Sequence, residues 1–100
     1  MRAKIVIDRA QLAEFCRRHN IRKFALFGSV LRDDFRSDSD VDVLVEFEPE
    51  AHIGMICLAG IEIELSEMLE RRVDLNTPGF LSRSFRDRVV AEAEVYYDAA

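Results

Sequence analysis

The most informative stretch of this sequence is residues 27–47, which read Phe-Gly-Ser-Val-Leu-Arg-Asp-Asp-Phe-Arg-Ser-Asp-Ser-Asp-Val-Asp-Val-Leu-Val-Glu-Phe. Side chains alternate in its second half. The side chains on one face are Val41, Val43, Val45 and Phe47. Those on the opposite face are Asp40, Asp42, Leu44 and Glu46. A period of two over seven residues indicates a β-strand, which ends before Pro49. The sequence therefore predicts a strand that presents two aspartates on one face.

A second strand and a turn are predicted just before it. Residues 23–27 are short and apolar and stop at Gly28, as a buried strand does before a turn. A glycine allows a ligand to approach the backbone, and the amides of a short helix over residues 30–34 would favour a phosphate. Ser29 can add a hydrogen bond, and Arg32, three residues on, can clamp a phosphate oxygen. An ordinary tight turn would also explain Gly28 and Ser29.

The paired aspartates carry the stronger signal. On a strand, Asp40 and Asp42 stand about 6.6 Å apart on one face. At an effective dielectric constant near 20, two charges at that distance repel by roughly 3 kcal/mol. A divalent cation would oppose this repulsion, and together with a nucleoside triphosphate it would suit a displacement at phosphorus. The open alternative is a strand face where both carboxylates simply meet water.

A calcium loop of the EF-hand type is excluded by the same residues. Asp38, Asp40 and Asp42 begin like such a loop. The loop requires glycine at its sixth position and glutamate at its twelfth, where this chain has Val43 and Pro49.

Asp74 is the candidate third carboxylate. Residues 73–77 predict a short strand that the Pro78-Gly79 turn closes, with Asp74 facing opposite to Val73 and Leu75. If this strand neighbours the one with Asp40 and Asp42, the three acids can converge. Asp74 could then accept a proton from an attacking hydroxyl or complete a metal site. A solvated residue on an edge strand is the alternative.

Three longer helices are predicted around these strands. Asp8 and Gln11 form a capping box, after which Leu12, Phe15 and Cys16 share a face until Asn20. Residues 53–71 form the longest helix. Its main apolar stripe is Leu58, Ile61, Leu65 and Leu69, while Met55, Ile56 and Ile63 lie outside it. Those three residues predict either a partner or dimer surface or a helix buried on two sides.

The last helix is expected to begin at a Ser82 cap and to direct four side chains inward, Phe85, Val89, Ala93 and Tyr96. The resulting order predicts an α+β fold, a small mixed β-sheet covered by helices, in a single domain over residues 1–100.

Composition limits the classes of function. The chain is 49% hydrophobic and 33% charged, with a net charge of −5, so it should not attract nucleic acid nonspecifically. Its longest uncharged apolar stretch, residues 53–61, is too short for a membrane span, and no signal peptide is evident, so we expect a cytoplasmic protein. Cys16 and Cys57 are expected to be free thiols within the core, and His19 and His52 to be surface residues.

Together, Gly28-Ser29, ten intervening residues and Asp40-Val41-Asp42 resemble the signature of the polymerase-β-like nucleotidyltransferase superfamily. The whole of residues 27–47 is similar to the minimal nucleotidyltransferase family. The resemblance implies the polymerase-β-like fold, a triphosphate held by Ser29 and Arg32 in the turn after Gly28, and metal binding by Asp40, Asp42 and Asp74. Family members often have glycine where this chain has Asp33, which affects the expected shape of the turn.

The resemblance also implies a function. Members of this family are usually encoded beside a HEPN-type toxin, and those with an intact site transfer AMP from ATP to a tyrosine of the toxin. We therefore predict a Mg²⁺-dependent nucleotidyltransferase with ATP as substrate and a HEPN-type toxin as partner. Both a homo-oligomer and a hetero-oligomer are compatible with this prediction. The alternative is an inactive antitoxin that neutralises its partner by contact alone. Antibiotic modification is less favoured, and modification of tRNA stays open.

Overall fold

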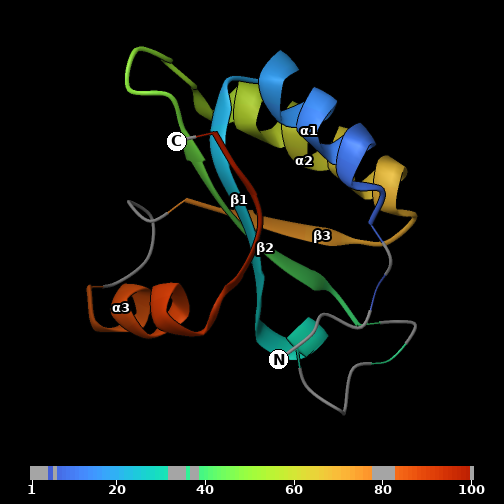
Figure 1. Cartoon of the computed structure of the whole chain (residues 1–100), viewed down its shortest axis with the longest axis vertical. Coiled ribbons are helices and arrows are strands. Elements are labelled where there is room, and N and C mark those ends of the chain that lie inside the picture. The colour runs from blue at the N-terminus through green and yellow to red at the C-terminus, as the bar shows by residue number, and fades with distance from the viewer. Residues whose placement is uncertain (1–4, 6, 32–35, 37–38, 78–82, 100) are drawn as a thin grey trace.

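A four-stranded mixed sheet forms the centre of the computed structural model, which describes residues 5, 7–31, 36, 39–77 and 83–99 (Figure 1). Its strand order is β3-β2-β1-β4. The four strands are β1 (Ile21–Phe27), β2 (Val41–Phe47), β3 (Val73–Asn76) and β4 (Glu94–Asp98). Strand β1 pairs antiparallel with both β2 and β4, whereas β3 runs parallel to β2. The fold class is therefore α+β with a mixed sheet, as predicted.

The alternation in β2 divides the molecule into two layers of packing. Val41, Val43 and Val45 are fully buried in the main core, beneath α1 (Arg9–Arg18) and α2 (Met55–Leu69). On the opposite face Leu44 joins a smaller cluster with Ala25, Phe27 and Val89, the last from α3 (Arg83–Glu92). Figure 1 shows α1 and α2 on one side of the sheet and α3 on the other. Asp42, and Asp40 two residues before it, therefore lie on the side of the sheet that faces α3.

Helix α1 begins where the sequence predicts. The Asp8 Oδ1 atom accepts hydrogen bonds from the N–H groups of Ala10 and Gln11 at 2.9 and 3.1 Å, so two of the free donors at the helix start are satisfied. The chain leaves the helix at Asn20, whose φ of 59° lies in the left-handed region that asparagine tolerates. The predicted face of Leu12, Phe15 and Cys16 is buried.

Helix α2 closes the outer edge of β3. The Val73 N–H donates to Ser66 Oγ at 3.1 Å, and the Leu75 N–H donates to Glu62 Oε2 at 2.8 Å. An edge strand otherwise leaves such donors unpaired. Because the two bonds lie on either side of Asp74, α2 fixes the backbone that carries this carboxylate.

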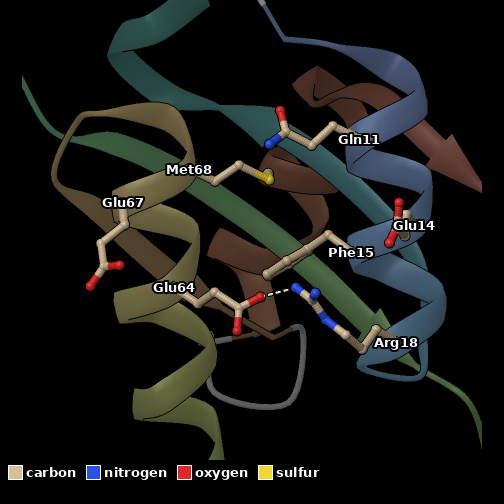
Figure 2. Close-up of a pocket in the computed structure, with 7 residues that line it drawn as sticks. All are labelled: Gln11, Glu14, Phe15, Arg18, Glu64, Glu67 and Met68. Carbon is tan, nitrogen blue, oxygen red and sulfur yellow. Dashed lines mark hydrogen bonds and ion pairs between the residues drawn. The ribbon is translucent and has the colours of Figure 1, made fainter.

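Glu64 joins α2 to α1. Its Oε2 atom accepts a hydrogen bond from Arg18 Nη2 and lies 3.1 Å from His19 Nε2, and Figure 2 shows Glu64 and Arg18 reaching toward one another between the helices. The hydrogen bond with His19, more than the charge of Arg18, lowers the pKa of Glu64. His19 is thus half-buried and engaged, rather than the surface histidine that we expected. The contact explains how two helices from distant parts of the chain are held together.

The C-terminal residues form a strand where the sequence predicts helix. Helix α3 ends at Glu92, so Ala93 and Tyr96 are not helical, although Val89 is buried as expected. Strand β4 pairs with the edge of β1 that β2 leaves free, and Tyr96 and Tyr97 are residues that strands favour. Arg9 fastens this strand to α1, because its Nη1 atom donates to the Tyr96 carbonyl at 2.9 Å and its guanidinium lies 4.2 Å from the centre of the Tyr96 ring. The Pro78-Gly79 turn, Ser82 and the Phe85 side chain lie outside the described residues.

The expectation that both cysteines are buried is wrong for Cys57, and one of the two alternatives for Met55, Ile56 and Ile63 is excluded. Cys16 is buried, which raises the pKa of its thiol to about 12, but Cys57 is exposed on α2. Met55, Ile56 and Ile63 are 70%, 92% and 60% exposed, so α2 is not buried on two sides in this chain. Within the described ranges, no helix has the length and apolar character needed to cross a membrane.

The edge contact of Glu62 gives a testable prediction. Glu62→Ala removes the acceptor of the Leu75 N–H, and the free energy of unfolding should fall by about 1–3 kcal/mol, as measured by urea denaturation. Glu62→Gln keeps an acceptor oxygen and should lose less. Glu67→Ala, on the exposed side of the same helix, is the matched control. Equal stability of the Glu62→Ala and Glu67→Ala variants would contradict this account of the sheet edge.

Candidate active site

The turn after β1 brings Gly28 against Asp42. Gly28 has φ +77°, a conformation that side chains other than glycine rarely adopt. A Cβ atom at this position would also overlap Asp42 Oδ2. Phe27 pairs with Asp42 across β1 and β2, which explains why the next residue lies beneath the carboxylate. Glycine is therefore required twice here, for the backbone angle and for the close approach of Asp42.

Ser29 lies beside the start of β2. Residues Gly28–Leu31 form a single turn of 3-10 helix (η1), anchored by the buried side chains of Val30 and Leu31. The Ser29 hydroxyl donates a long hydrogen bond of 3.4 Å to the Asp40 carbonyl. The short helix thus begins earlier than the predicted residues 30–34. Arg32, the expected phosphate clamp, lies outside the described residues.

Two of the three predicted carboxylates stand on neighbouring strands, and the third, Asp40, lies just before β2. Asp42 and Asp74 are register partners in the parallel pair of β2 and β3, which places them on one face of the sheet. Asp40 precedes Asp42 by two residues, and its side chain is 50% exposed. Asp42 is half-buried and Asp74 is exposed. The adjacency of the two strands, which was the condition for the acids to converge, is present as the parallel pairing of β2 and β3.

The chemistry of this face fits a cation that arrives with its substrate. Carboxylate oxygens are the donors that hard divalent cations prefer. In the part of the chain that the structure describes, no group of three or more His, Cys, Asp or Glu residues is arranged to hold a metal ion. Mg²⁺ is commonly bound by one or two carboxylates, with phosphate oxygens and water completing its shell. Asp40 and Asp42 suit this kind of site better than a permanent metal centre.

Arg72 lies beside Asp40 and two residues before Asp74, although the sequence did not identify it as a candidate. Its Nε atom lies 4.0 Å from Asp40 Oδ1, and its side chain is 84% exposed. The Val41 N–H donates to the Arg72 carbonyl at 2.9 Å, which holds the backbone of Arg72 beside the start of β2. Arg72 precedes Asp74 by two residues and lies just before the predicted strand of residues 73–77, so extending the alternation of that strand by one residue could have identified it.

Two hollows of the surface lie apart from these carboxylates. One, of about 470 Å³, lies between α1 and α2 on the opposite side of the sheet (Figure 2) and is lined by Gln11, Glu14, Phe15, Arg18, Glu64, Glu67 and Met68. Another, of about 540 Å³, follows the edge of α2 and β3 as far as Arg72. Neither is lined by Asp40, Asp42 or Asp74. The three acids therefore lie outside both hollows.

Known proteins resemble this chain over most of its length. The family described as Nucleotidyltransferase domain matches residues 9–97. The protein adenylyltransferase MntA of Thermococcus cleftensis is 35% identical over 85 residues, covering 83% of this chain and 82% of that protein. A solved structure described as a candidate minimal nucleotidyltransferase is 34% identical, covers 86% of each chain and superposes with a TM-score of 0.72.

Two more distant structures share the fold. A toxin–antitoxin complex with AMP-PNP superposes with a TM-score of 0.75 at 19% identity, over 92% of this chain and 74% of that one. A complex of a tri-AMPylated HEPN toxin with its MNT antitoxin, from Shewanella oneidensis, gives a TM-score of 0.61 at 21% identity, over 90% of this chain and 69% of that one. At these identities the likeness concerns the fold alone.

Substitution of Gly28 tests the geometry of the turn. Gly28→Ala forces an alanine into a positive φ and displaces the Asp42 carboxylate, so the free energy of unfolding should fall by about 1–3 kcal/mol. Isothermal titration should also show weaker binding of a Mg²⁺–nucleotide. The control is Gly60→Ala, in the middle of α2, where an added methyl group meets nothing within 4 Å and stability should rise by about 1 kcal/mol. Unchanged nucleotide binding by Gly28→Ala would refute the prediction that the contact between Gly28 and Asp42 shapes the binding site.

Proposed function

Because this chain belongs to the nucleotidyltransferase domain family, we propose that it is a Mg²⁺-dependent enzyme that transfers AMP from ATP to a hydroxyl group of a partner protein. Its fold is that of the polymerase-β-like nucleotidyltransferases, as the resemblance implied. The observation that carries the proposal is the junction of the Gly28 turn with Asp42 and, on the neighbouring strand, Asp74. This junction brings the turn that carries Ser29 beside two carboxylates that can donate oxygens to a cation.

We assign a role to each site residue, from its position where the structure describes it and from the family resemblance for Arg32. Ser29, in the turn after Gly28, and Arg32 hold the triphosphate through hydrogen bonds and charge. Asp40 and Asp42 hold Mg²⁺, which neutralises charge on the phosphates when it is bound. Asp74, beside Asp42, is placed to receive a proton from the acceptor hydroxyl.

The proposed transfer step is a displacement at the α-phosphorus of ATP. The acceptor oxygen forms a bond to that phosphorus, and its proton passes to the Asp74 carboxylate. The bond from the α-phosphorus to the oxygen that bridges to the β-phosphate breaks, and pyrophosphate leaves with the bonding electrons. The product is AMP joined to the acceptor through a phosphodiester.

The proposed acceptor is a tyrosine of a HEPN-type toxin. Two observations support a protein as acceptor. The Thermococcus cleftensis relative is named a protein adenylyltransferase, and an AMPylated HEPN toxin accompanies the antitoxin in the Shewanella oneidensis complex of the same fold. Asp40 and Asp74 are both exposed, so a large substrate can reach them from outside. These points favour a macromolecular acceptor over a small molecule enclosed in a pocket.

Transfer of label tests the enzymatic proposal. With ATP labelled at the α-phosphorus and a cognate HEPN-type toxin, we expect label on the toxin. Asp42→Asn should reduce the rate by at least about 10²-fold, because several kcal/mol of charge stabilisation are lost. Asp87→Asn, on the exposed surface of α3, should transfer at the normal rate. Absence of label with the unaltered chain, or undiminished transfer by Asp42→Asn, would refute the proposal.

A second candidate function is neutralisation of the partner by contact alone. The exposed apolar residues Met55, Ile56 and Ile63 favour it, because such a patch on a soluble protein often marks a protein-binding surface. A double variant, Asp40→Asn with Asp42→Asn, discriminates in cells that express the toxin. Loss of protection would favour chemistry, whereas full protection would mean that contact is sufficient.

A further inference from the structure

Arg72 forms an ion pair that is poorly suited to stabilise the fold. Its Nε atom is 4.0 Å from Asp40 Oδ1, at the outer limit of an ion pair, and the two side chains are 84% and 50% exposed. Exposed pairs of this kind contribute little to stability, since water solvates both partners and salt screens them. The guanidinium can therefore exchange Asp40 for another anion at little cost.

The backbone beneath this side chain is, by contrast, firmly held. The Arg72 carbonyl accepts the Val41 N–H at 2.9 Å, and the next residue donates its N–H to Ser66 Oγ at 3.1 Å. These bonds tie the base of the Arg72 side chain to β2 on one side and to α2 on the other. An exposed guanidinium thus projects from a fixed point beside the carboxylates.

The neighbouring arginine is used differently. Arg71 donates from Nη1 to the Arg36 carbonyl at 3.1 Å. Arg72 instead directs its charge to Asp40, a proposed metal ligand. Of this adjacent pair, Arg72 is the one placed to respond when a cation binds.

We propose that Arg72 is a phosphate-binding residue of this site, which pairs with Asp40 in the absence of a cation and moves to the bound nucleotide when a cation takes its place. The inference rests on the proposed function. A divalent cation held by Asp40 would repel the guanidinium and take its partner carboxylate. Arg72 could then donate to phosphate oxygens of a nucleotide at the same face, which is the pairing that a guanidinium suits best.

Two titrations with opposite expectations test this role. With Mg²⁺ present and no acceptor protein, Arg72→Ala should bind AMP-PNP, an ATP analogue with an imido bridge between the β- and γ-phosphates, at least roughly tenfold more weakly than the unaltered chain. With Mn²⁺ alone, the same variant should bind the cation as tightly or more tightly, since the competing guanidinium is gone. Arg72→Lys keeps the charge without the paired donors and should bind the analogue with intermediate affinity. Arg17→Ala, exposed on α1 across the sheet, should match the unaltered chain in both titrations.

The outcomes separate this inference from the function on which it rests. If the unaltered chain binds the analogue and Arg72→Ala binds it equally well, the role of Arg72 is refuted and the proposed function stands. Weakening of Mn²⁺ and analogue binding together would indicate a structural role and would also refute the inference. A folded, unaltered chain that binds no analogue would overturn both. Thermal unfolding followed by circular dichroism confirms that each variant is folded.

Discussion

The site depends on the contact between Gly28 and the Asp42 carboxylate. No other residue fits at position 28, because the backbone has a positive φ and the space for a Cβ atom is filled by Asp42. Several features of the fold produce this contact. Antiparallel pairing of β1 and β2 sets Phe27 opposite Asp42, parallel pairing sets Asp74 beside Asp42, and α2 secures the outer edge of β3. The sheet therefore acts as a frame that brings three distant segments of the chain to one face.

Electrostatic repulsion explains why this frame must be stiff. Strands that carry acids side by side gain nothing from their proximity in water, and the buried valines behind β2 must hold them together. Positive charge on the open side relieves the repulsion. Arg72 supplies part of it to Asp40 in the chain alone, and a cation with its nucleotide would supply more.

Much of this arrangement could be predicted from the sequence, because it is encoded locally. The period-two pattern of β2, the cap at Asp8 and the break at Gly28 each act within a few residues, and all three were confirmed. Strand β4 was missed because Val89, Ala93 and Tyr96 also fit a helical spacing, whereas its pairing with β1 depends on residues some seventy positions away. Arg72 was missed for a similar reason, since its proximity to Asp40 follows from strand register. The functional roles of Ser29, Arg32 and the three acids stay predictions.

The central claim is that the cation and nucleotide bind at the Gly28 turn and the aspartate strands. The most direct test is line broadening by Mn²⁺ in ¹H–¹⁵N NMR spectra recorded with AMP-PNP. The account predicts that the amide signals of Gly28, Ser29, Asp42 and Asp74 broaden first. Glu14 and Glu67, which line the hollow between α1 and α2, should keep sharp signals. Broadening that begins at Glu14 and Glu67 and spares Asp42 would place the cation on the other side of the sheet and contradict the account.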